Sequence, residues 1–125
     1  RNIMPHIENG RIHLIVGDVC DPAACARAVK GADLVIHAAA ESHVDNSFSN
    51  SLEFSRTNVQ GTHCLMEACR AAAVKRIIHV STDEVYGEIT RGKADEDAAL
   101  KPTNPYSASK AAAEMVISGY RQSFN

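Results

Sequence analysis

Three short runs of apolar, mostly β-branched residues alternate with longer stretches of helical pattern. They lie at 12–16, 33–37 and 77–81, and each is followed by small or polar residues. A short apolar run bounded in this way is typical of a strand buried on both faces of a parallel sheet. Because parallel strands need crossover connections, the alternation predicts an α/β fold with a doubly wound parallel sheet and flanking helices.

Local signals place the helices between and after these strands. Asp21 fits an N-cap and Pro22 a first helical position, so we expect a helix at about 22–30. A longer helix with one apolar side is expected at 51–73, and a final Ala-rich helix at 106–124. The charge-rich stretch between the last strand and the last helix is expected to be a solvated loop.

The composition excludes several classes of protein. The chain has 125 residues, 45% of them hydrophobic, and a net charge of -2 without a basic stripe, so it fits one domain that binds no nucleic acid. No apolar run approaches the ~20 residues of a membrane span, and a cytoplasmic protein is expected. The four cysteines form no Cys-x-x-Cys pair and the histidines are scattered, so we expect reduced thiols and no metal site.

The third apolar run ends in a cluster of hydroxyls and carboxylates, Ser81-Thr82-Asp83-Glu84. In an open α/β sheet, ligands bind at the carboxyl ends of the strands, so this cluster is a candidate site. The alternative is an acidic turn that only solvates the loop.

The segment from Asn104 to Lys110 opens the final helix and places Tyr106 four residues before Lys110, on the same helical face. An ammonium close to a phenol favours the phenolate, so Tyr106 is a candidate general base. The alternative is a tyrosine packed at a helix start beside a solvated lysine.

Four motifs together resemble the extended short-chain dehydrogenase/reductase superfamily, and within it the nucleotide-sugar 4,6-dehydratases. They are His-Ala-Ala-Ala-Glu-Ser-His-Val-Asp-Asn-Ser at 37–47, Thr-Asn-Val-Gln-Gly-Thr at 57–62, Ser-Thr-Asp-Glu-Val-Tyr-Gly at 81–87 and Pro-Thr-Asn-Pro-Tyr-Ser-Ala-Ser-Lys at 102–110. The resemblance covers nearly the whole chain. It implies NAD as cofactor, a homodimer, and conversion of dTDP-glucose or UDP-glucose to the 4-keto-6-deoxy sugar nucleotide.

The resemblance also implies a role for each motif residue. Tyr106 takes the proton of the 4-hydroxyl, Glu84 that of C5, and Asp83 protonates the departing 6-hydroxyl. Thr82 binds the 4-oxygen, and Lys110 holds the ribose of the cofactor. The implied cofactor-binding residues are Asp18, Val19, Ala38, Ala39, Ala40, Thr57, Tyr106 and Lys110, and the implied substrate-binding residues are Ser42, Thr82, Asp83 and Glu84.

The chain has no Gly-x-x-Gly-x-x-Gly turn among its seven glycines, so it is expected to be an internal fragment. Residues 1–125 would be a partial NAD-binding Rossmann domain that lacks the glycine-rich βαβ unit and the C-terminal substrate domain. Its strands would be the third, fourth and fifth of the order 3-2-1-4-5-6, with the first two about 14 Å apart. The isolated chain is then expected to be poorly stable and prone to aggregate.

Two other functions stay open. A nucleotide-sugar epimerase or decarboxylase of the same superfamily shares the tyrosine and the lysine, but has no need for the acid and base pair Asp83-Glu84. A catalytically inactive Rossmann module that acts as a binding subunit is the second alternative.

Overall fold

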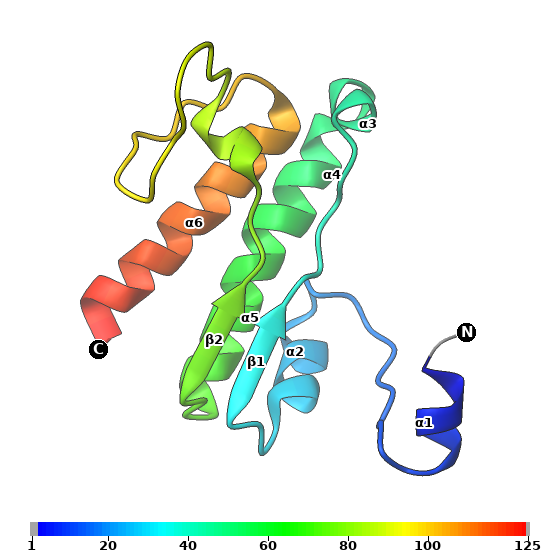
Figure 1. Ribbon diagram of the computed structural model, residues 1–125. Coiled ribbons are helices and arrows are strands. Elements are labelled where there is room, and N and C mark those ends of the chain that lie inside the picture. Colours follow the sequence, from blue (N-terminus) through cyan, green and yellow to red (C-terminus); the bar gives the residue numbers. More distant parts are fainter. Residues whose placement is uncertain (1–2, 125) are drawn as a thin grey trace.

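The computed structural model describes residues 3–124 and shows a small parallel sheet with helices on one of its faces (Figure 1). Strands β1 (Leu34–His37) and β2 (Arg76–His79) pair in parallel, with Leu34 opposite Arg76 and His37 opposite His79. The helices are α1 (Met4–Glu8), α2 (Pro22–Val29), α3 (Val44–Ser49), α4 (Ser51–Ser55), α5 (Gly61–Ala71) and α6 (Pro105–Phe124), with a π-helical turn η1 (Arg56–Gln60) and a 3₁₀ turn η2 (Asp83–Tyr86). Two of the three predicted strands and all three predicted helices are therefore confirmed.

The predicted strand at 12–16 does not form, and this expectation is wrong for the described residues. The segment 11–17 has no strand pairing, and Leu14 and Val16 are exposed. A cavity of about 390 Å³ separates Ile15 from the free edge of β1. An extended segment becomes a strand only when a neighbour completes its hydrogen-bond ladder, and here the nearest strand edge lies across the cavity.

Helix α2 begins where the sequence predicts. The Asp21 carboxylate accepts a hydrogen bond from the N–H of Ala23 at 2.9 Å, and Pro22 occupies the first helical position. Gly31 follows the helix with a φ of 75°, a conformation that glycine adopts without steric cost. These local signals fix both ends of α2.

The core lies between α2, α5 and the inner face of the sheet. Its most buried members are Cys25 and Val29 of α2 with Leu65 and Cys69 of α5. Burying an aliphatic side chain of this size contributes roughly 1.5–3 kcal/mol, so Val29 and Leu65 are main contributors to the packing of the two helices. Cys25 and Cys69 are free thiols that act here as small hydrophobic residues.

The predicted helix at 51–73 forms as three consecutive pieces, α4, η1 and α5. The π-helical turn in its middle buries Asn58, whose side chain is 2% exposed. Turns of this kind are rare and are found most often near functional sites. The apolar stripe alone could not reveal it.

The two faces of the sheet differ in how far the described residues cover them. Helices α2 and α5 lie on one face, and α6 packs against α5 (Figure 1). On the opposite face Leu34, Ile36, Ile78 and Val80 are 46%, 63%, 45% and 49% exposed. Burial on both faces, which the apolar runs predict for these strands, is therefore seen on one face only in the described part of the chain.

Two short helices, α1 and α3, were not expected from the sequence, because neither shows an apolar stripe. The loop after η2 forms as predicted and returns to it, with the N–H of Lys101 bound to the carbonyl of Val85 at 2.9 Å. Gly87 has a φ of 76°, and a Cβ there would lie 2.2 Å from the Lys101 carbonyl oxygen. Among residues 3–124, no helix combines the length and the apolar character needed to cross a bilayer.

Candidate active site

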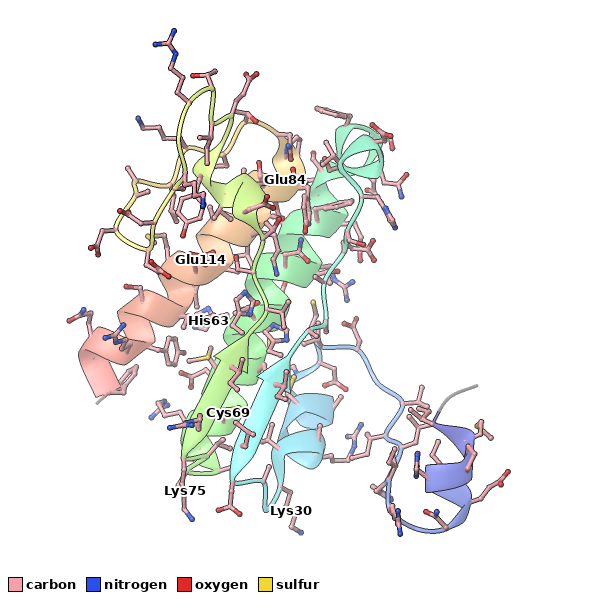
Figure 2. All side chains as sticks on the ribbon, viewed as in Figure 1. Lys30, His63, Cys69, Lys75, Glu84 and Glu114 are labelled. Carbon is pink, nitrogen blue, oxygen red and sulfur yellow. The ribbon has the colours of Figure 1, made fainter. Side chains whose placement is uncertain are left out.

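The carboxyl ends of β1 and β2 meet the start of α6 at one end of the molecule. Figure 2 shows Glu84 at the exit of β2 beside the first turns of α6, while Lys30 and Lys75 lie at the opposite end of the sheet. The predicted catalytic residues therefore come from two elements that the fold brings together, η2 with the residue before it, and α6.

Asp83 and Glu84 are adjacent in sequence but differ in their surroundings. Glu84 is half-buried, and its Oε2 accepts a hydrogen bond from Nδ2 of Asn104 at 3.2 Å. Asp83 is exposed, and the Thr82 hydroxyl approaches it at 3.4 Å. Thr82 also caps η2, since its Oγ1 accepts from the N–H of Glu84 at 3.3 Å. The turn thus places two neighbouring carboxyl groups in different surroundings.

Helix α6 positions Tyr106 and Lys110 through its first turn. Asn104 caps the helix, and its Oδ1 accepts from the N–H of Ser107 at 2.8 Å. Lys110 is 4% exposed, and its Nζ donates to the carbonyl of Val80 at 2.7 Å, which ties α6 to the end of β2. Burial lowers the pKa of Lys110, and the nearby Glu114 partly opposes this effect.

The ring of Tyr106 is held from the side by Phe54 of α4. The two rings meet edge to face, with centroids 6.2 Å apart. Tyr106 and Lys110 lie one helical turn apart on the same face of α6, as the spacing predicts.

Asn58 of η1 joins three segments of the site. Its Nδ2 donates to the carbonyl of Glu41 at 3.0 Å and to Oγ of Ser109 at 2.8 Å, and its Oδ1 accepts from the N–H of Glu41 at 2.8 Å. Ser109 in turn donates to the carbonyl of Tyr106 at 2.7 Å. One buried amide therefore connects the exit of β1, the π-helical turn and the start of α6.

The predicted cofactor-binding residues Asp18 and Val19 lie in a turn before α2. One oxygen of Asp18 accepts from the N–H of Cys20 at 2.8 Å, and the other pairs with Arg56 of η1. These contacts hold the pKa of Asp18 below its usual value, the Cys20 hydrogen bond having the larger effect and Arg56 the smaller. The sequence did not predict Arg56, because a pair between distant segments leaves no local pattern.

Asp18, Val19, Ala38 and Ala39 line the same cavity, next to the free edge of β1. The rest of its lining is mainly apolar and comes from Ile15, α2 and β1, so the predicted cofactor-binding residues make up only part of the cavity wall. The remaining candidates are found elsewhere. Ala40 and Ser42 are exposed beyond β1, and Thr57 is half-buried in η1.

Two histidines lie opposite each other on the strands below the site. His37 and His79 are partners in the register, with ring centroids 5.0 Å apart. Nε2 of His37 is 2.9 Å from Oγ1 of Thr62, whose hydroxyl donates to the carbonyl of Asn58 at 2.6 Å. Because that hydroxyl has one proton, His37 is the donor in its bond to Thr62.

Burial lowers the pKa of both histidines, and Lys110 adds to the effect. For His79 the pKa falls to about 4. Both rings are therefore neutral near pH 7. The sequence offered no signal for this pair, since a lone histidine in a strand is common.

Comparisons with known proteins agree with the resemblance in the motifs. A family model described as GDP-mannose 4,6-dehydratase matches residues 2–125. A trifunctional UDP-glucose 4,6-dehydratase, 3,5-epimerase and reductase of Arabidopsis thaliana is 44% identical over 135 residues, which cover 99% of this chain and 20% of the relative. The dTDP-D-glucose 4,6-dehydratase of Mus musculus is 43% identical over 122 residues, which cover 96% of this chain and 34% of the relative.

Solved structures share the arrangement. DesIV, a dTDP-glucose 4,6-dehydratase of Streptomyces venezuelae solved with NAD and dTDP, has a TM-score of 0.94 and 42% identity over 98% of this chain and 38% of its own. A UDP-glucose 4-epimerase of Thermus thermophilus solved with NAD has a TM-score of 0.81 and 35% identity over 86% of this chain and 36% of its own. The chain thus spans well under half of each relative. It belongs to the GDP-mannose 4,6-dehydratase family and has the Rossmann-like fold of these NAD-binding enzymes.

Proposed function

We propose that this chain carries the catalytic acid, base and tyrosine of a nucleotide-sugar 4,6-dehydratase that converts dTDP-glucose or UDP-glucose to the 4-keto-6-deoxy sugar nucleotide. The observation that carries the proposal is the junction of η2 and α6. There Asn104, one residue before α6, binds Glu84 at 3.2 Å, while Tyr106 and Lys110 follow on the same helix. A carboxylate pair and a tyrosine-lysine pair thus share one strand end.

The residues at the exit of β1 and before α2 fit NAD. Ala38, Ala39 and Ala40 leave the strand as exposed chain with methyl side chains, which lets a ligand approach the backbone closely. The exposed carboxylate of Asp18 has lone pairs beyond those used by Cys20 and Arg56, so it can accept from an adenine amino group. We assign these residues, with Val19 and Thr57, to the cofactor side of the site.

Lys110 fits the same cofactor. An ammonium has three N–H donors, and one of them goes to Val80, so the others can reach ribose hydroxyls. When bound, NAD supplies a hydride acceptor for C4 of the sugar and a hydride donor for C6.

The side chains of this chain then move the protons. Tyr106 removes the proton of the 4-hydroxyl, and Thr82 hydrogen-bonds the same oxygen. The resulting 4-keto group acidifies the C5 hydrogen, which Glu84 takes, while Asp83 protonates the 6-hydroxyl that leaves as water. As C6 takes up the hydride, Glu84 would return its proton to C5. The side-chain amide of Asn104 donates to Oε2 of Glu84, which leaves Oε1 to take the proton. Ser42, exposed at the exit of β1, is assigned to the sugar nucleotide.

The main rival is epimerisation or decarboxylation by the same Tyr106 and Lys110. Such reactions have no step that needs a second acid and base, which Asp83 and Glu84 provide. The fold does not discriminate, because dehydratases and epimerases share it. The carboxylate pair therefore favours dehydration.

The test uses a full-length protein that carries this chain, incubated with NAD and, separately, dTDP-glucose, UDP-glucose, GDP-mannose and a nucleotide uronic acid. A product lighter than the substrate by one water, with a carbonyl at C4 by NMR, supports the proposal and identifies the nucleotide. A product of unchanged mass but inverted C4 indicates an epimerase, and loss of carbon dioxide from a nucleotide uronic acid indicates a decarboxylase. NAD binding without turnover of any of these substrates indicates an inactive binding module.

We also propose a cytoplasmic homodimer that pairs the surfaces of α4 and α6. Leu52 of α4 and Met115 of α6 are 84% and 58% exposed, and four free cysteines suit a reducing compartment. Sedimentation velocity checks the first point, since Met115→Glu should shift the full-length protein toward monomer. Fractionation of cells that express a tagged copy checks the second.

A further inference from the structure

His79 occupies an unusual position for a polar side chain. Both ring nitrogens are buried, and neither has a hydrogen-bond partner among residues 3–124. The in-register partner His37 contacts Thr62 of α5, so both rings lie on the sheet face that the helices of this chain cover. Buried polar groups are nearly always satisfied, so the two nitrogens of His79 call for a partner.

Lys110 is the best candidate for a hydrogen-bond donor to His79. Its charge acts on His79 and on His37, and its one hydrogen bond to the protein among the described residues goes to Val80, the residue after His79. The ammonium is 4% exposed and has further N–H donors. His37 already donates to Thr62, whereas His79 offers a nitrogen lone pair without a competing donor.

We propose that His79 is a positioning residue for Lys110, whose ammonium donates to the neutral ring of His79 through one bridging water. The contact adds a second fixed point to the bond with Val80, so the ammonium is held in one orientation at the end of β2. Buried waters typically bridge two to four polar groups, and here Lys110 and His79 supply two. The effect of this contact on the reaction rate rests on the proposed function, whereas the contact itself does not.

The pH dependence of such a device follows from the groups that surround Lys110. The charged or titratable groups that interact with it are His37 and His79 from the sheet and Glu114 from α6. Tyr106 lies one turn before Lys110 on α6, and the neighbouring elements η1 and α5 carry the uncharged Asn58 and Thr62. An acceptor that faces an ammonium favours its charged form. Removing the acceptor therefore lowers the pKa of Lys110 further, in the direction in which burial already moves it.

The kinetic test compares His79→Leu and His79→Gln in a full-length dehydratase that carries this chain. In His79→Leu the basic limb of the pH profile of kcat/KM should move to lower pH by about one unit, with kcat reduced about tenfold. His79→Gln, which keeps an acceptor, should restore most of both. Ile77→Val, a core change on the same strand, should lower stability without moving the limb. An unmoved basic limb in a folded His79→Leu overturns the proposal.

A second measurement does not depend on activity. In protein labelled with ¹⁵N-histidine, the unprotonated ring nitrogen of His79 should show the shift of a hydrogen-bonded acceptor, and Lys110→Met should return it to the value of a free acceptor. An identical shift in both proteins overturns the inference. If the labelled protein behaves as expected but no 4-keto product forms, the contact stands and the proposed dehydration fails.

Discussion

At the residue scale, the site shows which side chains can be found from sequence and which need the fold. The placement of Glu84, Tyr106 and Lys110 at one strand end is predictable, because each follows a local signal, either the end of an apolar run or the start of a helix. Asn104 was predicted only as the residue before a helix, although its amide also binds Glu84 across 20 positions. This contact forms because the loop at 88–103 brings Asn104 back to η2, and no local sequence pattern predicts that path.

The first prediction concerns Glu84, a half-buried side chain that Asn104 holds by a hydrogen bond. In a full-length protein that carries this chain, Glu84→Gln should block removal of the C5 proton but leave oxidation at C4. Reduced cofactor should accumulate, visible in the nicotinamide absorbance, while release of the 4-keto-6-deoxy product falls about 10²- to 10⁴-fold. Glu88→Gln, an exposed loop change nearby, should behave like the parent. Product release at the parent rate in Glu84→Gln removes the residue from this role.

Tyr106→Phe should fail at an earlier step. The ring still packs edge-on against Phe54, so the fold should be kept while the hydroxyl is lost. Without its base the 4-hydroxyl keeps its proton, and no reduced cofactor should form in a single turnover. Stopped-flow absorbance compares this variant with Glu84→Gln, and accumulation of reduced cofactor in both would contradict the order of the steps.

The pH dependence of stability should carry a signature of His79. Burial, then Lys110 and His37, lowers its pKa from 6.5 to about 4, so folding favours the neutral ring. The stability that this group contributes is complete above pH 6.5 and is lost as pH falls through 6.5 toward 4, in total by about 3 kcal/mol.

Urea unfolding midpoints at pH 7, 5.5 and 4 measure this loss. The parent protein should lose stability more steeply across the range than His79→Gln, which does not titrate there. Equal slopes would show that His79 is not the group responsible.

At the scale of elements, local chemistry sets the ends of helices, and packing sets their interior. The starts of α2 and α6 follow from Asp21-Pro22 and Asn104-Pro105, whose side chains and rings act within one turn. The π-helical turn at 56–60 follows from the buried Asn58 and from close packing at Gly61, which are tertiary features. A helical pattern in the sequence therefore predicts the helix without its irregular turn.

Two helical glycines make a matched pair for testing that packing. A Cβ at Gly61 would lie 2.5 Å from Cγ1 of Val19, whereas a Cβ at Gly119 meets nothing within 4 Å among the described residues. Gly61→Ala should destabilise a full-length protein by about 1–3 kcal/mol through overpacking. Gly119→Ala should stabilise it by up to about 1 kcal/mol, because alanine is the better helix former.

Denaturant unfolding of the two glycine variants measures both changes in the free energy of unfolding, the loss in Gly61→Ala and the gain in Gly119→Ala. Since Val19 belongs to the proposed cofactor side, NAD affinity measured by fluorescence should fall in Gly61→Ala only. Stability gained in both variants would show that Val19 moves aside without cost.

At the scale of the whole molecule, the sequence predicts the parallel sheet correctly but not its strand at 12–16 or the exposure of one face. The apolar runs at 33–37 and 77–81 were correctly interpreted as strands, because β-branched residues bounded by polar ones favour that conformation. The run at 12–16 has the same composition but no neighbour within hydrogen-bonding reach. Burial of a sheet face likewise depends on the elements that pack against it, and the described residues cover one face only.

The exposed face leads to a prediction for the 125-residue polypeptide on its own. Four aliphatic side chains in contact with water and a free strand edge should leave it poorly stable, prone to aggregate and weak in NAD binding. Thermal unfolding by circular dichroism with and without NAD, together with light scattering, measures all three. A cooperative transition that rises with added cofactor would show that the polypeptide is a folded, binding-competent unit.

The π-helical turn lets its helix hold one extra residue while Phe54 keeps its contact with Tyr106. A π turn holds one residue more than an α turn, and each residue of an α-helix advances the helix by about 100°. Five residues in a π turn rotate the chain about as far as four residues in an α turn, so deleting one residue within 56–60 would leave an unbroken helix with Phe54 and Leu65 on nearly the same faces as before. Phe54 would stay against Tyr106, and the loss would fall on the buried Asn58 and its hydrogen bonds. A single deletion in this segment should therefore weaken the link between Glu41 and Ser109 and leave the packing of Tyr106 in place.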